Sequence, residues 1–162
     1  MLIGITGDTH NNLKNISKIC RIFNEEEVAL VIHTGDITLP KSLKAFSELQ
    51  MPLIGVFGNN DELEKVNLLL ESEKFSCSLF EEPHFLNIED KKICIVHHPN
   101  LISNEIIEKV DFIFHGHTHR YRSEIIRKVL IFNPGECAGF LVGKNKVGLV
   151  NIYENKSKVI SF

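Results

Sequence analysis

Apolar segments of strand length alternate with amphipathic segments of helix length in the first half of the chain, and this alternation is the strongest constraint on the fold. Strands are predicted at residues 2–6, 28–32 and 53–57, and helices at residues 12–24, 41–50 and 62–71. Such alternation is typical of repeated β-α-β units and not of a helical bundle or an all-β sandwich. The sequence therefore predicts an α/β fold.

The second half of the chain is richer in strands and contains one predicted helix, at residues 103–109. Strands are predicted at residues 85–88, 92–96, 111–115, 123–127, 129–132, 140–142, 147–153 and 158–161. Residues 143–146 and 154–157 are typical of hairpin turns. We therefore expect a parallel sheet packed on a second, more antiparallel sheet.

Length and composition fit a single domain over residues 1–162, because 162 residues with 43% hydrophobic content can fill one sizeable core. The N-terminus has no basic region followed by an apolar run, so a cytoplasmic location without a membrane segment is expected. The four cysteines are widely spaced and form no Cys-x-x-Cys pair, which predicts reduced thiols.

The charge balance argues against a protein that coats nucleic acid. The chain has 18 basic and 21 acidic residues and a formal net charge of −3. We therefore expect no extended nucleic-acid surface. Two bound divalent cations would change this charge to about +1 and concentrate it where an anion could bind.

Five of the predicted strands are followed directly by polar residues that can bind a ligand. These clusters are Gly7-Asp8-Thr9-His10, His33-Thr34-Gly35-Asp36, Gly58-Asn59-Asn60-Asp61, His97-His98 and His115-Gly116-His117-Thr118-His119. In open α/β sheets, ligands bind at the carboxyl ends of the strands. We therefore expect the five clusters to meet at one rim of the fold.

The clusters contain carboxylates, an amide oxygen and several imidazoles, but no thiolate. This set of donors suits Mn²⁺, Fe²⁺, Ni²⁺, Co²⁺ or Zn²⁺ better than Ca²⁺ or a soft metal. The Asp-x-His and His-x-His spacings place alternate side chains on the same side of an extended segment, so both can reach one ion. The sequence predicts a site for divalent metal, with Mn²⁺ as the expected ion.

The order of these motifs resembles that of the calcineurin-like metallophosphoesterases. The resemblance covers residues 1–140 and rests on Asp8-x-His10, Gly35-Asp36, Gly58-Asn59-x-Asp61, His97 and Gly116-His117-Thr118-His119. The short chain and Asn133-Pro134-Gly135 resemble the small single-domain phosphodiesterase branch of the family. The resemblance implies a four-layer α/β/β/α sandwich of two mixed β-sheets flanked by helices.

The resemblance also implies a centre of two divalent metal ions. The ligands of the first ion would be Asp8, His10 and His119. Those of the second would be Asn59, His97 and His117, and Asp36 would bridge both. Such ions lie about 3.5 to 4 Å apart, lower the pKa of a shared water and bind phosphate oxygens. A hydroxide bridging the two metals would attack phosphorus, so we expect a phosphodiesterase.

One position departs from the wider family, which has histidine where this chain has Asn60. An amide can hydrogen-bond a phosphate but cannot act as a general acid near neutral pH. His98 follows the expected ligand His97 at a position where the resemblance predicts glycine, so our hypothesis is that His98 replaces the missing acid. We favour small or nucleotide-derived diesters as substrates, because a diester bears one charge and needs no deep basic pocket.

Several of these residues also have a structural interpretation. Asp8 and Asp36 could cap helices, but we favour ligation because they occur together with the other clusters. Asn60 could contact phosphate or only form a turn. Asp61 could orient a neighbour or cap the following helix. Asp36, Asn60, Asp61 and His98 are the candidate catalytic residues.

Two other classes of function compete with the phosphodiesterase. A related eukaryotic retromer subunit uses the same fold as a catalytically silent interaction scaffold, but it has lost part of the ligand set, which is complete here. A nuclease or protein phosphatase could use the same centre, although the short chain leaves little room for added recognition elements. A homodimer paired through an edge strand of the second sheet is a further option.

Overall fold

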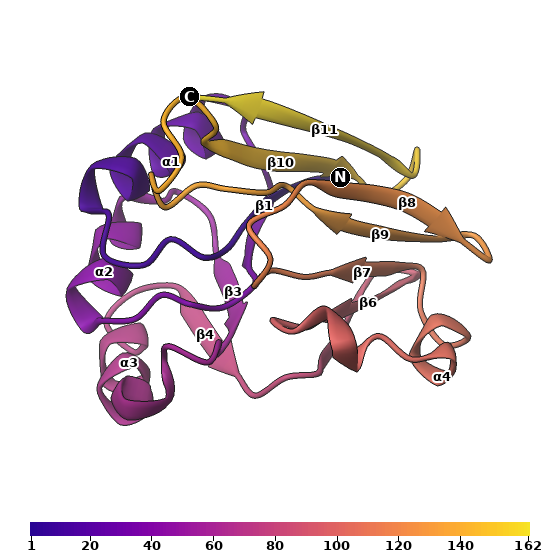
Figure 1. Ribbon diagram of the computed structural model, residues 1–162, viewed down its shortest axis with the longest axis horizontal. Helices are drawn as coiled ribbons and strands as arrows, with labels where there is room; N and C mark the ends of the chain where they lie inside the picture. Colours follow the sequence, from indigo (N-terminus) through magenta and orange to yellow (C-terminus); the bar gives the residue numbers. More distant parts are fainter.

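Two mixed β-sheets form the centre of the computed structural model, which describes residues 1–162 (Figure 1). The strands of the first sheet, in spatial order, are β11 (Lys156–Ser161), β10 (Lys146–Asn151), β1 (Leu2–Thr6), β2 (Leu30–His33), β3 (Leu53–Val56) and β4 (Cys77–Phe80). Those of the second sheet are β5 (His84–Ile88), β6 (Lys91–Ile95), β7 (Phe112–Phe114), β9 (Val129–Asn133) and β8 (Arg122–Ile126). Strands β1 to β4 are parallel, as are β6, β7 and β9, and the remaining pairs are antiparallel.

Helices cover the outer face of each sheet. They are α1 (Leu13–Glu25), α2 (Pro40–Ala45), α3 (Lys65–Ser72) and α4 (Asn104–Ile107). Figure 1 shows α1, α2 and α3 together on one side of the molecule and α4 at the opposite end. The parallel strands and their crossover helices explain this placement, since a β-α-β unit packs its helix on the face of its own sheet.

Three hydrophobic clusters separate the layers. The first packs helical residues such as Ile16, Phe23 and Leu43 against one face of the first sheet. The second lies between the sheets and joins residues of β1 to residues such as Phe114 and Phe132. The third packs α4 on the outer face of the second sheet. The predicted four-layer α/β/β/α sandwich is confirmed.

Four local features differ from the predictions. The predicted strand at residues 140–142 is an exposed loop that pairs with no strand. The predicted turn at residues 143–146 is therefore not a hairpin turn, since no strand precedes it and β10 already begins at Lys146. Strand β4 was missed, since Cys77 to Phe80 form a short edge strand with only one buried side chain. The helix predicted at residues 41–50 ends at Ala45 and continues as a 3₁₀ turn over Phe46–Glu48.

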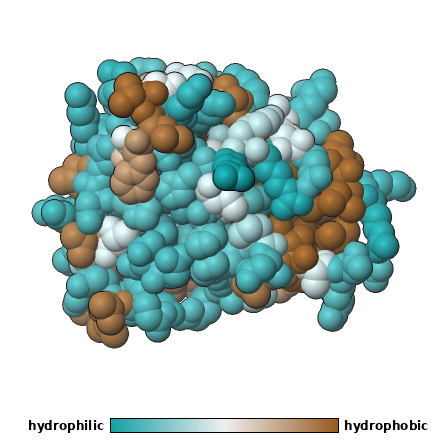
Figure 2. All heavy atoms as spheres, in the orientation of Figure 1, coloured by the Kyte–Doolittle hydropathy of each residue, from teal (hydrophilic) through white to brown (hydrophobic).

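The surface is mainly polar on the face shown in Figure 2. Its largest apolar area there lies toward the end of the molecule that carries α4 and the β8–β9 hairpin. No helix of the fold has both the length and the apolar character that crossing a membrane requires.

Candidate metal centre

The five predicted ligand loops meet at one rim of the sandwich. The loops after β1, β2 and β3 come from the first sheet, and those after β6 and β7 come from the second. Backbone hydrogen bonds join the loops within each sheet. The amide of Asp8 donates to the carbonyl oxygen of Gly35 at 2.8 Å, and the amide of Gly116 donates to that of His97 at 3.2 Å. Both sheets therefore contribute to one site.

Asp8, His10 and His119, the expected ligands of the first ion, lie together. Each offers one atom, and these atoms lie within 4.8 Å of one another. The Nε2 atom of His10 is buried and has no hydrogen-bond partner, and the Oδ2 atom of Asp36 lies 3.9 Å from it. An unpaired buried nitrogen is costly unless a cation or a hydrogen-bond partner satisfies it. These residues therefore fit a divalent metal ion.

Asn59, His97 and His117, the expected ligands of the second ion, also converge. The Oδ1 atom of Asn59 lies 3.0 Å from both His97 Nε2 and His117 Nδ1, and these two nitrogens are 3.2 Å apart. Lone pairs this close repel one another unless a proton or a cation lies among them. The Oδ2 atom of Asp36 is 3.6 Å from His97 Nε2, which places this carboxylate between the two groups.

Two histidines of the centre are held in place by hydrogen bonds at their Nδ1 atoms. The Nδ1 atom of His97 donates to the carbonyl oxygen of Thr34 at 2.9 Å, so its Nε2 carries the lone pair that faces the site. The Nδ1 atom of His119 forms a short hydrogen bond with the buried carboxylate of Glu136. Partners of this kind fix the tautomer and orientation of metal-binding histidines. Sequence reasoning missed Glu136, which no local motif connects to His119.

The electrostatics of the site favour a cation. Burial raises the pKa of Asp8 to about 7, although nearby His119 opposes the shift, because an enclosed carboxylate loses its hydration. Burial lowers the pKa of both His10 and His97, so these imidazoles are neutral at pH 7 and able to ligate. Burial also disfavours the charge of Asp36, but nearby His97 and hydrogen bonding outweigh it and hold the pKa of Asp36 below its usual value.

Asp61 and Asn60 both act on the loop that carries Asp36. The Asp61 carboxylate is fully buried and accepts backbone hydrogen bonds from Thr38 at 2.6 Å, Gly58 at 2.7 Å and Asp36 at 2.9 Å. It makes no capping bond to the turn that follows it. Asn60 donates to both oxygens of the Asp36 carboxylate, from its backbone amide at 2.9 Å and from its side-chain Nδ2 at 2.7 Å. The two residues therefore position Asp36.

His98 lies beside the second group of ligands. Its ring centroid is 4.4 Å from that of His117, and its Nδ1 atom is 2.6 Å from Glu82 Oε1. The other oxygen of Glu82 accepts from the backbone amides of His97 and His98 at 2.5 and 2.9 Å. Glu82 was not predicted, because it precedes these histidines by 15 and 16 residues. With Nδ1 bound to Glu82, Nε2 is the nitrogen of the His98 ring that remains free to bond another group.

A further buried histidine joins two of the ligand loops. His33 is fully buried, its Nδ1 atom accepts from the amide of Gly35 at 3.2 Å, and its Nε2 atom bonds Thr9 Oγ1 at 2.9 Å. Because Nδ1 accepts, the proton lies on Nε2 and the ring is neutral. Burial lowers the pKa of His33 to about 3. This ring therefore links the first and second ligand loops without a charge of its own.

Backbone strain concentrates at the expected ligands. Five of them have left-handed φ angles: Asp8 (52°), His10 (45°), Asp36 (59°), His117 (67°) and His119 (53°). Each such residue costs about 1 to 3 kcal/mol and persists only where its surroundings impose it. Close packing adds a steric constraint, since a Cβ at Gly58 would lie 2.2 Å from Asp36 Oδ1. The fold therefore holds these side chains together at a cost in the free energy of unfolding.

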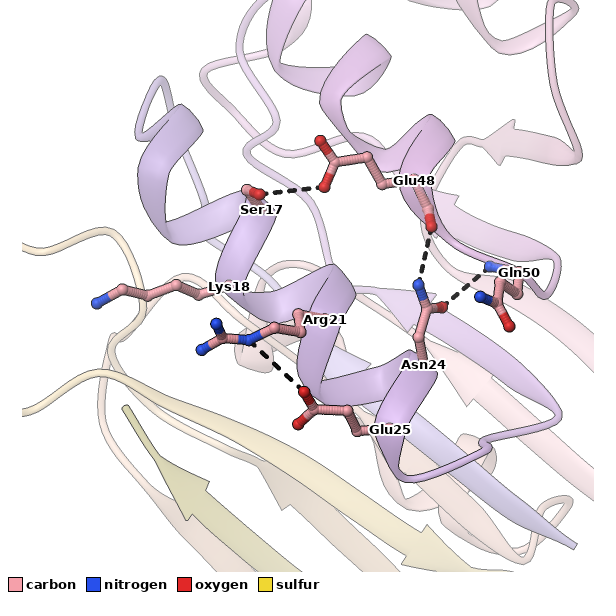
Figure 3. A pocket seen from close by; sticks show the side chains of 7 residues that line it. All are labelled: Ser17, Lys18, Arg21, Asn24, Glu25, Glu48 and Gln50. Carbon is pink, nitrogen blue, oxygen red and sulfur yellow. Dashed lines mark hydrogen bonds and ion pairs between the residues drawn. The ribbon is translucent and has the colours of Figure 1, made fainter.

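A polar hollow of about 500 Å³ lies elsewhere, on the outer side of α1 (Figure 3). Its groups largely satisfy one another: Ser17 donates to Glu48, and Asn24 bonds the backbone of Glu48 and Gln50. It is lined by Ser17, Lys18, Arg21, Asn24, Glu25, Glu48 and Gln50. None of the expected site residues lines it, so we assign the chemistry to the rim and not to this hollow.

Comparison with known proteins identifies the family. Residues 1–155 match the model of the calcineurin-like phosphoesterase superfamily domain. The chain is 35% identical to phosphodiesterase MJ0936 of Methanocaldococcus jannaschii, over 99% of this chain and 98% of that one. A solved archaeal phosphodiesterase superposes with a TM-score of 0.88 at 34% identity, with both chains fully covered. YfcE, a phosphoesterase from E. coli, shares the fold with a TM-score of 0.71 at 16% identity, with 99% of each chain covered. The chain belongs to the calcineurin-like phosphoesterase superfamily.

Proposed function

We propose that this protein is a phosphodiesterase that works at a centre of two divalent metal ions, with Mn²⁺ as the expected metal. The observation that carries the proposal is the buried, unpartnered Nε2 atom of His10, which lies 3.9 Å from Asp36 Oδ2 in a residue grouped with Asp8 and His119. The donor set of oxygen and imidazole nitrogen suits Mn²⁺ and its neighbours. The similarity to a phosphodiesterase over nearly the whole chain supports the choice of a diester as substrate.

The protein's own residues would prepare the site in advance. Bound divalent ions would lower the pKa of a shared water and bind the phosphate oxygens. Asp8, His10 and His119 would hold one ion and Asn59, His97 and His117 the other, with Asp36 shared. Thr34 and Glu136 keep two of the histidine rings turned toward the site. Groups fixed before the substrate arrives need no reorganisation during the reaction.

We further propose that His98 donates a proton to the leaving alkoxide. Asn60 is occupied with Asp36 and has no acidic proton to give near neutral pH. The Nδ1 atom of His98 is held by Glu82, so only Nε2 can face a substrate. A His98→Gln variant should lose activity mainly toward esters with poor leaving groups. Indistinguishable pH–rate profiles for the parent and this variant would remove His98 from the mechanism.

Metal analysis combined with turnover tests the main proposal. After reconstitution, we expect bound Mn²⁺ and Mn²⁺-dependent hydrolysis of bis(p-nitrophenyl) phosphate that is faster than hydrolysis of the monoester. An Asp36→Asn variant should lose activity by about 100-fold or more, because each metal supplies several kcal/mol of transition-state stabilisation.

The matched control is Asp90→Asn, which removes a carboxylate that is 75% exposed on the surface. It should keep the parent's metal content and turnover. A reconstituted parent protein that binds no metal and hydrolyses neither ester would overturn the proposal and favour the interaction scaffold instead.

A further inference from the structure

Three consecutive apolar residues project from the loop between β9 and β10. Phe140 is 67% exposed, Leu141 57% and Val142 97%. The loop turns at Gly139 and Gly143, whose φ angles of +86° and +70° lie in the left-handed region. Large apolar side chains grouped on a surface often mark a place where a ligand binds. The sequence alone suggested a strand here, but the loop pairs with no strand.

The ring of Phe140 lies against the candidate metal centre. Its centroid is 5.2 Å from the ring of His10 and 5.6 Å from the ring of His119, and it is nearly parallel to the latter. Both histidines are expected ligands of the same ion. Phe140 therefore extends the wall of the site from the ligands toward solvent.

Glu136 fixes the position of this ring. One oxygen of its buried carboxylate accepts from the backbone amide of Phe140 at 2.9 Å, and the other bonds His119 Nδ1. The same carboxylate thus holds a metal-binding histidine and the start of the exposed apolar segment. The closeness of Phe140 to the centre is therefore built into the hydrogen bonding of the site.

A hollow of about 500 Å³ opens beside the ring. It is lined by His10, Asn11, Asn12, Leu13, Ala138 and Phe140. This volume is suitable for a small organic group. The Oδ1 atom of Asn11 already accepts from Thr38 and Ser42, so the amide nitrogen of Asn11 is its remaining donor. The hollow offers an aromatic wall, apolar contacts and a polar edge.

We infer that Phe140 and this hollow form a subsite for a planar aromatic group esterified to the substrate's phosphate, such as a nucleobase-bearing or aryl group. The inference rests on the proposed function, because the phosphate would occupy the metal centre next to it. An aromatic side chain adds about 5- to 150-fold in affinity for a stacked base. Such a subsite would select substrates by the group attached to phosphorus, apart from the chemistry of hydrolysis.

Ligands that carry a comparable phosphonate or phosphate anion but differ in the attached group isolate this effect. Dissociation constants of methylphosphonate, phenylphosphonate and adenosine 5′-monophosphate are measured by calorimetry on the Mn²⁺-loaded protein. We expect the two aromatic ligands to bind at least about fivefold tighter than methylphosphonate. Adenosine monophosphate binding tighter than phenylphosphonate would identify a nucleobase as the favoured group, whereas equal affinities would identify aryl groups in general.

Variants then assign the preference to the ring. In Phe140→Ala, the affinities for the aromatic ligands should fall to about the affinity of the same variant for methylphosphonate, and Phe140→Tyr should keep the preference; the Mn²⁺ content of each variant is measured alongside. Val142→Ala is the control, because Val142 belongs to the same loop but lines no part of the hollow.

Equal binding of the three ligands by the parent, or a preference that survives Phe140→Ala, would overturn the inference. Failure of the proposed function is a separate result, since it would show as absent metal, no methylphosphonate binding and no hydrolysis of bis(p-nitrophenyl) phosphate.

Discussion

Replacing Asp61 by asparagine tests how the loops of the candidate metal centre are held together. The Oδ2 atom of Asp61 accepts from the amides of Asp36 and Gly58, and Oδ1 accepts from the amide of Thr38. An asparagine can place its side-chain carbonyl oxygen where Oδ2 of Asp61 lies now. Its NH₂ group must then face the Thr38 amide, where two donors would lie about as close as the present 2.6 Å bond.

The expected magnitude follows from these three bonds. A hydrogen bond to a charged group contributes about 1.5 to 3 kcal/mol, and a donor left without a partner costs about 1 to 3 kcal/mol more. Burial raises the pKa of Asp61 even though three amides donate to it, so removing the charge recovers part of the loss. We therefore expect the free energy of unfolding to fall by about 2 kcal/mol in Asp61→Asn and by about 4 kcal/mol in Asp61→Ala.

Urea unfolding of the metal-free protein measures this loss. The chain contains no tryptophan, so far-ultraviolet circular dichroism is the suitable signal, and a chelator removes any contribution of metal binding. Asp90→Asn, on an exposed side chain, should change the unfolding free energy by less than about 0.5 kcal/mol. If Asp61→Asn is no more destabilised than this control, the carboxylate does not hold the loops as argued.

Three further predictions concern the same region. Gly58→Ala should displace Asp36, because the added Cβ would lie 2.2 Å from its Oδ1 atom, and Mn²⁺ content should fall. Glu136→Gln should weaken Mn²⁺ binding by about 10- to 100-fold in calorimetry, since His119 loses its carboxylate partner. Unfolded histidine takes up a proton near pH 6.5, but folded His33, with a pKa of about 3, does not, so acid favours unfolding. Between pH 6 and 4.5 the unfolding free energy of His33→Gln should therefore fall less steeply than the parent's, by up to about 1.4 kcal/mol per pH unit.

Each of these has a result that would contradict it. Gly143→Ala is the control for the glycine: its φ of +70° makes alanine cost about 1 kcal/mol, but the Cβ would meet nothing within 4 Å, so this variant should retain metal. Equal metal loss in both glycine variants would point to general unfolding. Unchanged Mn²⁺ affinity in Glu136→Gln would show that His119 needs no partner. Parallel pH profiles for the parent and His33→Gln would mean that this ring titrates normally in the folded protein.

The buried strands and the ligand loops could be predicted from the sequence for a physical reason. A strand covered on both faces reads as a continuous apolar run, and the polar residues that end it stand out by contrast. That contrast located Asp8, Asp36 and His97 before any geometry was known. The structure confirms the four layers and brings all seven expected ligands to one rim, while their binding of metal stays a prediction.

The parts that could not be predicted depend on contacts between distant segments. Glu136 and Glu82 orient histidines 15 to 17 residues away in sequence, and nothing near either glutamate indicates this. Phe140 to Val142 have the composition of a strand, and only the tertiary structure shows that they lack a strand partner and border the centre instead. From the sequence, Asp61 could cap a helix or orient a neighbouring residue, and its complete burial in the structure favours the second role.

The placement of ligands on loops of both sheets has a consequence for the protein's lifetime. Ions held by both groups of ligands would crosslink the two halves of the sandwich, so global unfolding would require their release. Apparent stability would then rise with the logarithm of free metal concentration once this exceeds the dissociation constant. Under metal starvation, the same molecules would become inactive and more easily degraded, so metal supply would control their abundance as well as their turnover.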